Sequence, residues 1–542
     1  MTPTRPAGRW SRLGSFLDTE SGATGLPLHA LVAIAFGIHV LVAFLALNPW
    51  HPDEHFQILE FAWARAGLTP TDSLPWEWSA RIRPTLQPTL ALVPLEALRA
   101  LGLTSPFLWV LLLRLGTLVL AFAVLLRVFA HVSPTLGREG RRTLWLAGLF
   151  LWFLPLFLFR FTSENLSGMA LAWALVLTSG HDPTARRDVA AGALLGLSFV
   201  FRLQMAAAGV VVLAWTALGG AGGRARATRM ALAATAVVAA GAVLDSWFYG
   251  GWVVTQWEYV RVNVFEGVAS SFGTTPWYGY VLWAPVWMAP PLGLAIAVLV
   301  LAGLASHRRD PWSWVLAAVV LSHSLVPHKE LRFLLPLLYV LPVVVARGAD
   351  AWVRWSSYPR PSAADTVTEP SRPWPRRIVV WSLVLQNAIF LALVATPAIH
   401  RGSEVDVHYL QYLWRTAERH PDEPVWVLND EDGPYRIYGI DASVYHHPRV
   451  RGVRHRAGEP VPAEVPAQTP PERLLLLTRA DARPEVAGAD ATELAYAAEP
   501  GYRGMARLMG VEDAAWVRWL ESVDGWGAAT GARRLHRVRV AP

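Results

Sequence analysis

Two carboxylates stand side by side in the stretch NPWHPDEHFQ, residues 48–57, directly after the apolar run at 28–47. At a membrane edge, Asp53 and Glu54 can act as a general base toward a hydroxyl group or can hold a cation. A structural role is the alternative, because an acidic residue that follows a proline at a helix start stabilises the helix dipole. We expect this pair to be catalytic.

Histidines flank the two carboxylates. His51 and His55 are four residues apart, and this spacing places both on one helix face, where they can ligate a metal. No third ligand follows at a regular spacing, so we predict no required metal and no other cofactor. Asp53 and Glu54 can nevertheless hold a divalent cation. We expect His51 and Gln57 to bind substrate.

A second polar cluster lies in VPHKELRFLLP, residues 326–336, where two apolar runs meet. Lys329 is the only lysine of the chain, and the other 47 of its 48 basic residues are arginines. An ammonium at this position and the planar fork of Arg332 suit a phosphate at the headgroup level, and Glu330 can orient either cation. The alternative is a membrane anchor whose charge reaches the interface, but arginine fills that role elsewhere in this chain. We expect His328, Lys329 and Arg332 to bind phosphate.

Four further polar residues lie at the edges of apolar runs. Arg202 and Gln204 fall between two such runs, where a charge is costly and usually functional. Asp245 ends another run within LDSWFYGGW, and Asn263 follows it. We expect all four to bind substrate. The aromatic residues around them suit either an interfacial belt or a surface on which a sugar stacks.

The composition indicates a polytopic membrane protein that positions these groups. Of 542 residues, 53% are hydrophobic and 16% are charged. The absence of cysteine excludes disulfides and thiolate metal sites. The net charge of +7 does not indicate a nucleic-acid partner, because the basic residues are spread over short loops between apolar runs. We expect eleven apolar segments to span the membrane. They lie at 28–47, 105–131, 143–160, 165–180, 188–202, 205–219, 229–248, 280–304, 312–327, 334–347 and 378–397.

The distribution of arginine predicts the topology. Cytoplasmic loops are enriched in basic residues, and the rule gives one alternating path through the membrane. Its cytoplasmic parts are the tail 1–27 and the loops at 136–142, 181–188, 222–229, 306–309 and 347–377. Arg202 then lies at an outer crest between two short spans. Most of the unusual polar residues fall on the outer face, which should hold the site.

Three domains are expected. The tail 1–27 precedes a transmembrane domain at 28–397, whose long first outer loop, 48–104, has the apolar spacing of two amphipathic helices at 53–66 and 88–101. We expect residues 398–542 to form a small extracytoplasmic α/β domain. Its expected strands lie in EPVWVLN and ERLLLLT, and its expected helices lie at 405–419 and 511–523.

Four motifs in this order resemble one family, the glycosyltransferase family 22 mannosyltransferases, which build GPI anchors and the lumenal arms of the N-glycan precursor. They are HPDEHFQ, WEWSARIRPTLQP, LDSWFYGGW with FGTTPWYGY, and PHKELRFLLP. The second departs from the family pattern at Pro84, where a small hydroxyl residue is usual. The resemblance covers roughly residues 30–347.

The resemblance implies a GT-C fold and an inverting transfer of a sugar, usually mannose, from a dolichyl or other polyprenyl phosphate on the lumenal or periplasmic face. It assigns the base to Asp53, with Glu54 as its substitute, and the donor phosphate to His328, Lys329 and Arg332. The alanine- and arginine-rich composition is typical of a high-GC bacterium and favours an undecaprenyl-type donor at the inner membrane. The acceptor would be a lipid-linked glycan, an envelope glycan or a protein.

Other functions fit parts of this pattern. A transporter or flippase of polyprenyl-linked glycans should carry charges near the membrane midplane and a repeated half, whereas these charges cluster at one edge. Another GT-C transferase, with a different sugar, would use similar residues. A catalytically inactive protein that only binds polyprenyl phosphate would not need Asp53.

Overall fold

The computed structural model describes residues 27–180, 183–356, 374–395, 407–430, 433–437, 440–479, 482–497 and 533–540. Most of the predicted tail 1–27, the central part of the loop 347–377 and the predicted helix 511–523 lie outside these ranges. The chain divides into two compact units. The helical unit comprises Met1–Leu41 and Arg114–Leu393, and the mixed unit comprises Val42–Leu113 and Val394–Pro542.

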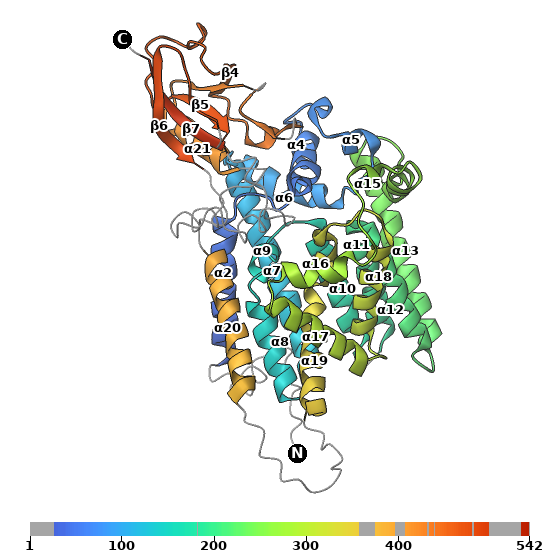
Figure 1. Ribbon diagram of the computed structural model, residues 1–542. Coiled ribbons are helices and arrows are strands. Elements are labelled where there is room, and N and C mark those ends of the chain that lie inside the picture. Colours follow the sequence, from blue (N-terminus) through green and yellow to red (C-terminus); the bar gives the residue numbers. More distant parts are fainter. Residues whose placement is uncertain are drawn as a thin grey trace, which may run out of the picture. The chain divides into compact units, whose positions relative to one another are not determined.

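Helices build the helical unit (Figure 1). The boundary between the units falls within α2 (Leu28–Leu45) and α7 (Pro106–Val132). The other long helices are α8 (Arg138–Phe150), α10 (Ser163–Thr178), α11 (Ala185–Phe201), α12 (Ala206–Leu218), α13 (Gly223–Phe248), α17 (Leu292–Ser306), α18 (Pro311–Leu325), α19 (Leu341–Ser356) and α20 (Trp374–Val394). Shorter elements are α9 (Leu154–Phe157), η5 (Leu203–Met205), α14 (Thr255–Val260), η6 (Arg261–Phe265), α15 (Val268–Ser271), α16 (Gly279–Trp287) and η7 (Leu331–Tyr339).

Side-chain caps and small residues explain much of this packing. Thr162 caps α10 by accepting a hydrogen bond from the Asn165 amide at 3.3 Å, and Asp310 caps α18, whose first residue is a proline. Gly192 lets α11 approach α13 closely, because a Cβ there would lie 2.1 Å from the Met230 carbonyl oxygen. Backbones can therefore pack tightly where large apolar residues would hold them apart.

Each of the eleven predicted membrane segments contains helix, but three are broken. The segment 143–160 forms α8 and α9, 280–304 forms α16 and α17, and 334–347 lies across η7 and α19, whose axes differ by 69°. By length and apolar composition, three helices of the described chain can each cross a membrane alone, α2, α7 and α13, or four if the bent pair counts as one span.

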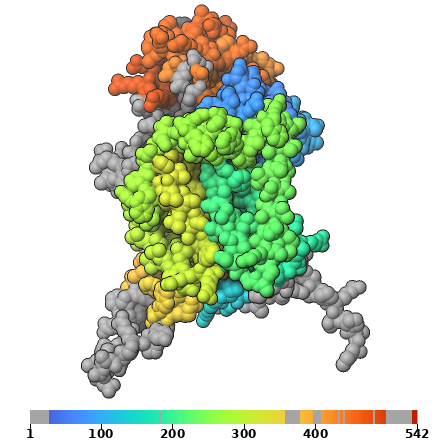
Figure 2. Space-filling model, turned by 90° about the vertical axis from the view of Figure 1, so that its right-hand side faces the viewer, coloured from blue at the N-terminus to red at the C-terminus, as the bar shows by residue number. Residues whose placement is uncertain are grey.

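The exposure of α13 fits a membrane protein. Its residues, green in Figure 2, are exposed along much of the helix, and the apolar side chains of Leu232 and Val243 are 67% and 62% exposed. Apolar side chains stay exposed where lipid rather than water surrounds them. The predicted fold class, a helical membrane protein with a small C-terminal sheet region, is confirmed.

The mixed unit combines a five-stranded sheet with helices of the first loop. The sheet strands are β1 (Val425–Asn429), β4 (Val450–Arg454), β5 (Leu474–Arg479), β6 (Ala489–Ala497) and β7 (Arg533–Val540), and α21 (Val407–Arg419) precedes them. The strand order is β4-β1-β5-β7-β6, with β1 parallel to β4 and β5, and β7 antiparallel to β5 and β6. The predicted strands in EPVWVLN and ERLLLLT are β1 and β5.

The first loop belongs to the same compact unit as this sheet. Its two predicted helices are present, the first as α3 (Pro52–Glu54), the π-helix η2 (His55–Leu59) and α4 (Glu60–Arg65), the second as α6 (Leu86–Ala100). Between them lie η3 (Thr71–Ser73) and α5 (Trp76–Ala80). The described part of the unit also contains one antiparallel strand pair, β2 (Arg436–Ile437) and β3 (Ile440–Asp441), and the 3-10 turn η9 (Ser443–Tyr445). The boundaries expected at residues 27 and 397 stay predictions.

Candidate active site

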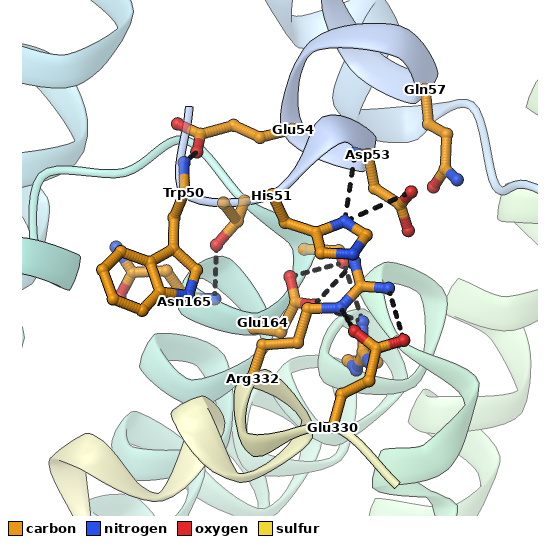
Figure 3. Close-up of polar contacts among 12 residues, drawn as sticks. Trp50, His51, Asp53, Glu54, Gln57, Glu164, Asn165, Glu330 and Arg332 are labelled. Atoms are coloured by element: carbon orange, nitrogen blue, oxygen red, sulfur yellow. Dashed lines mark hydrogen bonds and ion pairs between the residues drawn. The ribbon is translucent and has the colours of Figure 1, made fainter. Parts of the chain in front are cut away.

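Asp53 lies in the first turn of α3, in the mixed unit (Figure 3). His51 caps this helix, because its Nδ1 accepts a hydrogen bond from the Asp53 amide at 3.2 Å, and Pro52 occupies the first helical position. The same Nδ1 lies 3.3 Å from Asp53 Oδ1. The Asp53 side chain keeps 22% of its surface exposed, so the carboxylate is held in place and is still accessible.

A chain of polar contacts joins Asp53 to the second motif. Arg83 Nη2 lies 3.6 Å from Asp53 Oδ2 and 3.8 Å from Glu77 Oε1. Glu77 in turn accepts a hydrogen bond from Gln57 Nε2 at 2.9 Å. The prediction placed Gln57 at the site but missed Glu77 and Arg83, although both belong to the quoted stretch WEWSARIRPTLQP.

Glu54 has a different environment from Asp53. It is buried, and its Oε2 accepts a hydrogen bond from the Trp50 amide at 3.0 Å (Figure 3). This contact closes the turn that leads from α2 into α3. The two adjacent carboxylates therefore face different partners. Among the described residues, no three histidine, aspartate or glutamate side chains gather as a metal site would require.

A buried network ties this helix to the C-terminal part of the mixed unit. Glu60 and His55 are each 1% exposed, and His55 Nε2 lies 2.8 Å from Glu60 Oε1. The same carboxylate accepts hydrogen bonds from the Ser443 hydroxyl and, at 3.1 Å, from the Val444 amide. The His55 ring also stacks on Tyr445 with a centroid separation of 5.2 Å. Buried carboxylates need such donors, so the network fixes the segment that carries Asp53.

The helical unit has its own cluster of charges. Arg202, in extended backbone between α11 and η5, pairs with Glu164 of α10 at 2.7 Å, and both side chains are buried. Its guanidinium also lies over the Phe333 ring, 4.9 Å from the centroid. Arg332 contacts the same ring at 5.4 Å and approaches Glu164 at 3.9 Å. Two arginines and one carboxylate therefore surround one aromatic ring.

Glu330 organises the predicted phosphate motif (Figure 3). Its carboxylate accepts hydrogen bonds from Nε and Nη2 of Arg332 and lies 2.8 Å from His328 Nε2. The other His328 nitrogen faces the Gly273 carbonyl at 3.1 Å. Both ring nitrogens therefore face acceptors, an arrangement that only the protonated ring satisfies. The hydrogen bond with Glu330 accordingly raises the pKa of His328 above its ordinary value.

Lys329 is buried, and its ammonium donates hydrogen bonds to two main-chain carbonyls. These are Thr275 at 3.0 Å and Val326 at 2.5 Å. Burial lowers the pKa of Lys329. A Cβ on Gly279 would lie 3.4 Å from Lys329 Cδ, so the lysine stem runs close to the backbone of α16. In this structure the lone lysine joins the turn before η7 to the segment 273–279.

The remaining predicted residues have polar partners of their own. Gln204 Nε2 donates to the Tyr259 hydroxyl at 2.7 Å, and Asn263, in the π-helix η6, donates to the Tyr259 carbonyl at 3.1 Å. Asp245 is fully buried and accepts a hydrogen bond from the Thr255 hydroxyl at 2.6 Å. Gln204 and Asn263 therefore meet at one tyrosine, while Asp245 fixes the start of α14.

Comparison with known proteins decides the family. The model of the Alg9-like mannosyltransferase family matches residues 30–449. The chain belongs to this family. The match passes residue 347, where the resemblance found in the sequence ends, and includes Ser443 and Tyr445 of the buried network. The chain is therefore a member of a glycosyltransferase family and an integral membrane protein, as predicted.

Curated relatives share about a quarter of their residues with this Alg9-like chain. GPI mannosyltransferase 3 of Yarrowia lipolytica is 26% identical, over 75% of this chain and 78% of the relative. Mannosyltransferase APTG1 of Arabidopsis thaliana is 23% identical, over 73% of each chain. GPI alpha-1,2-mannosyltransferase 3 of Homo sapiens is 23% identical, over 72% and 66% of the two chains.

Solved structures of two kinds also match. ArnT from Cupriavidus metallidurans, bound to undecaprenyl phosphate, gives a TM-score of 0.43 at 14% identity, over 78% of this chain and 85% of that chain. The Archaeoglobus fulgidus oligosaccharyltransferase gives 0.46 at 13% identity, over 78% and 63%.

Proposed function

We propose that this Alg9-like protein is an inverting glycosyltransferase with a GT-C architecture. It would move mannose from a polyprenyl phosphate donor to a lipid-linked or envelope glycan. The family match over residues 30–449 carries the proposal, because it covers both the motif that contains Asp53 and the motif that contains Arg332. In a bacterium, the donor would be an undecaprenyl-type lipid and the reaction would take place on the periplasmic face of the inner membrane.

In the proposed reaction, the acceptor hydroxyl attacks the anomeric carbon and Asp53 takes its proton. The new bond joins the acceptor oxygen to the sugar, and the bond from the sugar to the phosphate oxygen breaks. Polyprenyl phosphate leaves with the electron pair of that bond. Arg83 lies beside the Asp53 carboxylate and His51 caps the helix that carries it, so the base is oriented before the substrate binds.

The cations of the helical unit suit the leaving phosphate. Arg332 presents a planar fork, and the protonated ring of His328 adds a second donor. In the structure, the Glu330 carboxylate contacts both groups. A phosphate that binds Arg332 therefore competes with this carboxylate. Cations can neutralise a leaving phosphate without a metal, so we propose that transfer requires no metal.

The remaining residues have supporting roles in this proposal. Gln204, Asn263 and Arg202 would position the donor sugar and its phosphate, and Lys329 would keep the turn that carries Arg332 in place. Asp245 would support these groups through α14. Glu54 would replace Asp53 as base only if its contact with the Trp50 amide opened.

The test follows label transfer from radiolabelled polyprenyl phosphate mannose to a glycolipid extract. Asp53→Asn should abolish transfer and keep donor binding, because the amide cannot accept the hydroxyl proton. Asp72→Asn is the matched control, since Asp72 is an exposed carboxylate of the same loop. Full transfer by Asp53→Asn would reject the base assignment. Donor binding without transfer in the wild type would point to a different acceptor or sugar.

A further inference from the structure

A second polar site lies in the helical unit, away from the charge cluster around Glu164. It is a cavity of about 640 Å³, a size typical of ligand pockets. Its wall is formed where α7, α10 and α12 end, by the turn between α17 and α18, and by α19. The lining residues that matter here are His131, Ser179, His307, Arg308, Arg309 and Arg347.

Two helices show that this cavity is distinct from the charge cluster around Glu164. Glu164 is in the first turn of α10, whereas Ser179 follows its last residue, and a helix of 16 residues is about 24 Å long. The residues that open α18 line the cavity, whereas the turn that carries His328 follows the other end of α18. The cavity and the charge cluster therefore occupy opposite ends of the same helices.

The cavity is lined by positive charge. Three arginines line it with one acidic residue, Asp310. Asp310 is engaged by the Arg347 guanidinium and by the Ser313 amide, which it caps at 3.2 Å. The charges of Arg308 and Arg309 have no such carboxylate among the lining residues. A site of this composition favours an anion.

The turn that carries these two arginines is fixed by the protein. The Trp215 indole of α12 donates to the Arg309 carbonyl at 2.8 Å, and the Trp314 indole of α18 donates to the Arg308 carbonyl at 2.6 Å. A loop that only marks the membrane orientation needs charge but no fixed geometry. Two indole contacts from two helices indicate a built site.

Two histidine–serine contacts complete the wall. His131 Nε2 lies 2.9 Å from the Ser179 hydroxyl, and His307 Nδ1 lies 2.8 Å from the Ser306 hydroxyl. Burial and the nearby Arg347 guanidinium lower the pKa of His307. The two serine hydroxyls donate to the Leu175 and Ala302 carbonyls of their own helices, so the guanidinium groups are the donors that this wall offers to phosphate oxygens.

We propose that this cavity, which we call the basic cavity, binds a phosphate group independently of the transfer reaction. The phosphate belongs either to an anionic lipid headgroup or to a soluble phosphate compound. The lipid source fits the position of the cavity at the ends of apolar helices, since basic pockets between such helices bind anionic headgroups.

The experiment measures phosphate binding to the purified full-length protein in detergent. Native mass spectrometry counts bound phosphatidylglycerol, with phosphatidylcholine as the zwitterionic comparison, and a parallel titration uses inorganic phosphate as the soluble probe. The Arg308→Gln/Arg309→Gln variant removes both charges. Arg138→Gln/Arg224→Gln is the matched control, because it removes two exposed arginines outside the cavity. Gel filtration and the melting temperature verify that both variants fold.

We expect saturable binding of phosphatidylglycerol that weakens at least tenfold in the cavity variant and stays unchanged in the control. Binding of inorganic phosphate with the same dependence, without a lipid preference, supports the phosphate site and assigns a soluble source. Equal losses in both variants would mean general surface charge and would overturn the proposal. Absence of binding by either probe would overturn it as well. None of these outcomes depends on mannose transfer.

Discussion

Replacing Ser443 by alanine tests whether the C-terminal part of the mixed unit holds the helix that carries Asp53. The Ser443 hydroxyl donates to the buried Glu60 carboxylate, which also receives the Val444 amide. Loss of one hydrogen bond to a charged group costs about 1.5–3 kcal/mol. The segment around His55 is tied to the same carboxylate. The free energy of opening this segment should therefore fall by that amount.

The assay is hydrogen exchange followed by mass spectrometry on peptides that cover residues 52–65. Since every 1.4 kcal/mol changes an equilibrium tenfold, the lost bond should speed exchange by roughly 10- to 100-fold in these peptides. Ser73→Ala is the control, because the Ser73 hydroxyl donates only to the Pro70 carbonyl in an exposed turn. Peptides of the helical unit should keep their wild-type protection.

Unchanged exchange in residues 52–65 of the Ser443→Ala variant would refute this reasoning. It would mean that the first loop is held by its own packing and that the buried network is incidental. If exchange accelerates as expected, mannose transfer should fall too, because a mobile base is in the productive position for less of the time.

Three further predictions concern the helical unit. Lys329→Arg should lower the transfer rate at least about tenfold, because a planar guanidinium cannot replace an ammonium between two carbonyls. The control is Arg354→Lys, a change at an exposed residue that should leave the rate unaltered. Wild-type rates in Lys329→Arg would mean that the lone lysine has no role in transfer. Arg202→Met should destabilise the protein by about 3–5 kcal/mol, since it removes the 2.7 Å ion pair of the buried Glu164 carboxylate, which Arg332 at 3.9 Å does not replace. The added Glu164→Gln change should restore most of the melting temperature, and a double variant as unstable as the single one would contradict this. The raised pKa of His328 means that its charged contact is fully present below its ordinary pKa of 6.5 and is lost as the pH rises through the raised value. Donor affinity measured across that range should fall with pH in the wild type and stay flat in His328→Gln.

The helices could be predicted from the sequence because long apolar runs have few alternatives in a membrane. Their breaks could not be predicted from hydropathy, because the runs at 143–160 and 280–304 stay apolar where the helices stop. Proline is the local signal that the prediction did not use: Pro290 and Pro291 separate α16 from α17, and Pro342 follows the bend of 69° between η7 and α19.

Part of the candidate site could be predicted from residue types in the sequence. The rest depends on contacts between segments that are far apart in the sequence. Asp53 and Arg332 carry chemistry that can be recognised in isolation. Nothing in the sequence around Glu60 indicates a buried partner, and that partner, Ser443, is 383 positions away. Lys329 was recognised by its rarity, but rarity does not name a partner, and the structure gives it two carbonyls.

The π-helix η2 makes the length of the first loop helix a strict requirement. It lies between α3, which carries Asp53, and α4, which begins at Glu60. Each residue in an α-helix turns the chain by about 100°. Deleting one residue from this wider turn would therefore rotate the carboxylates of Asp53 and Glu60 relative to each other. One of them would then lose its partner, either Arg83 or Ser443. Relatives that keep both contacts should keep the number of residues between these carboxylates.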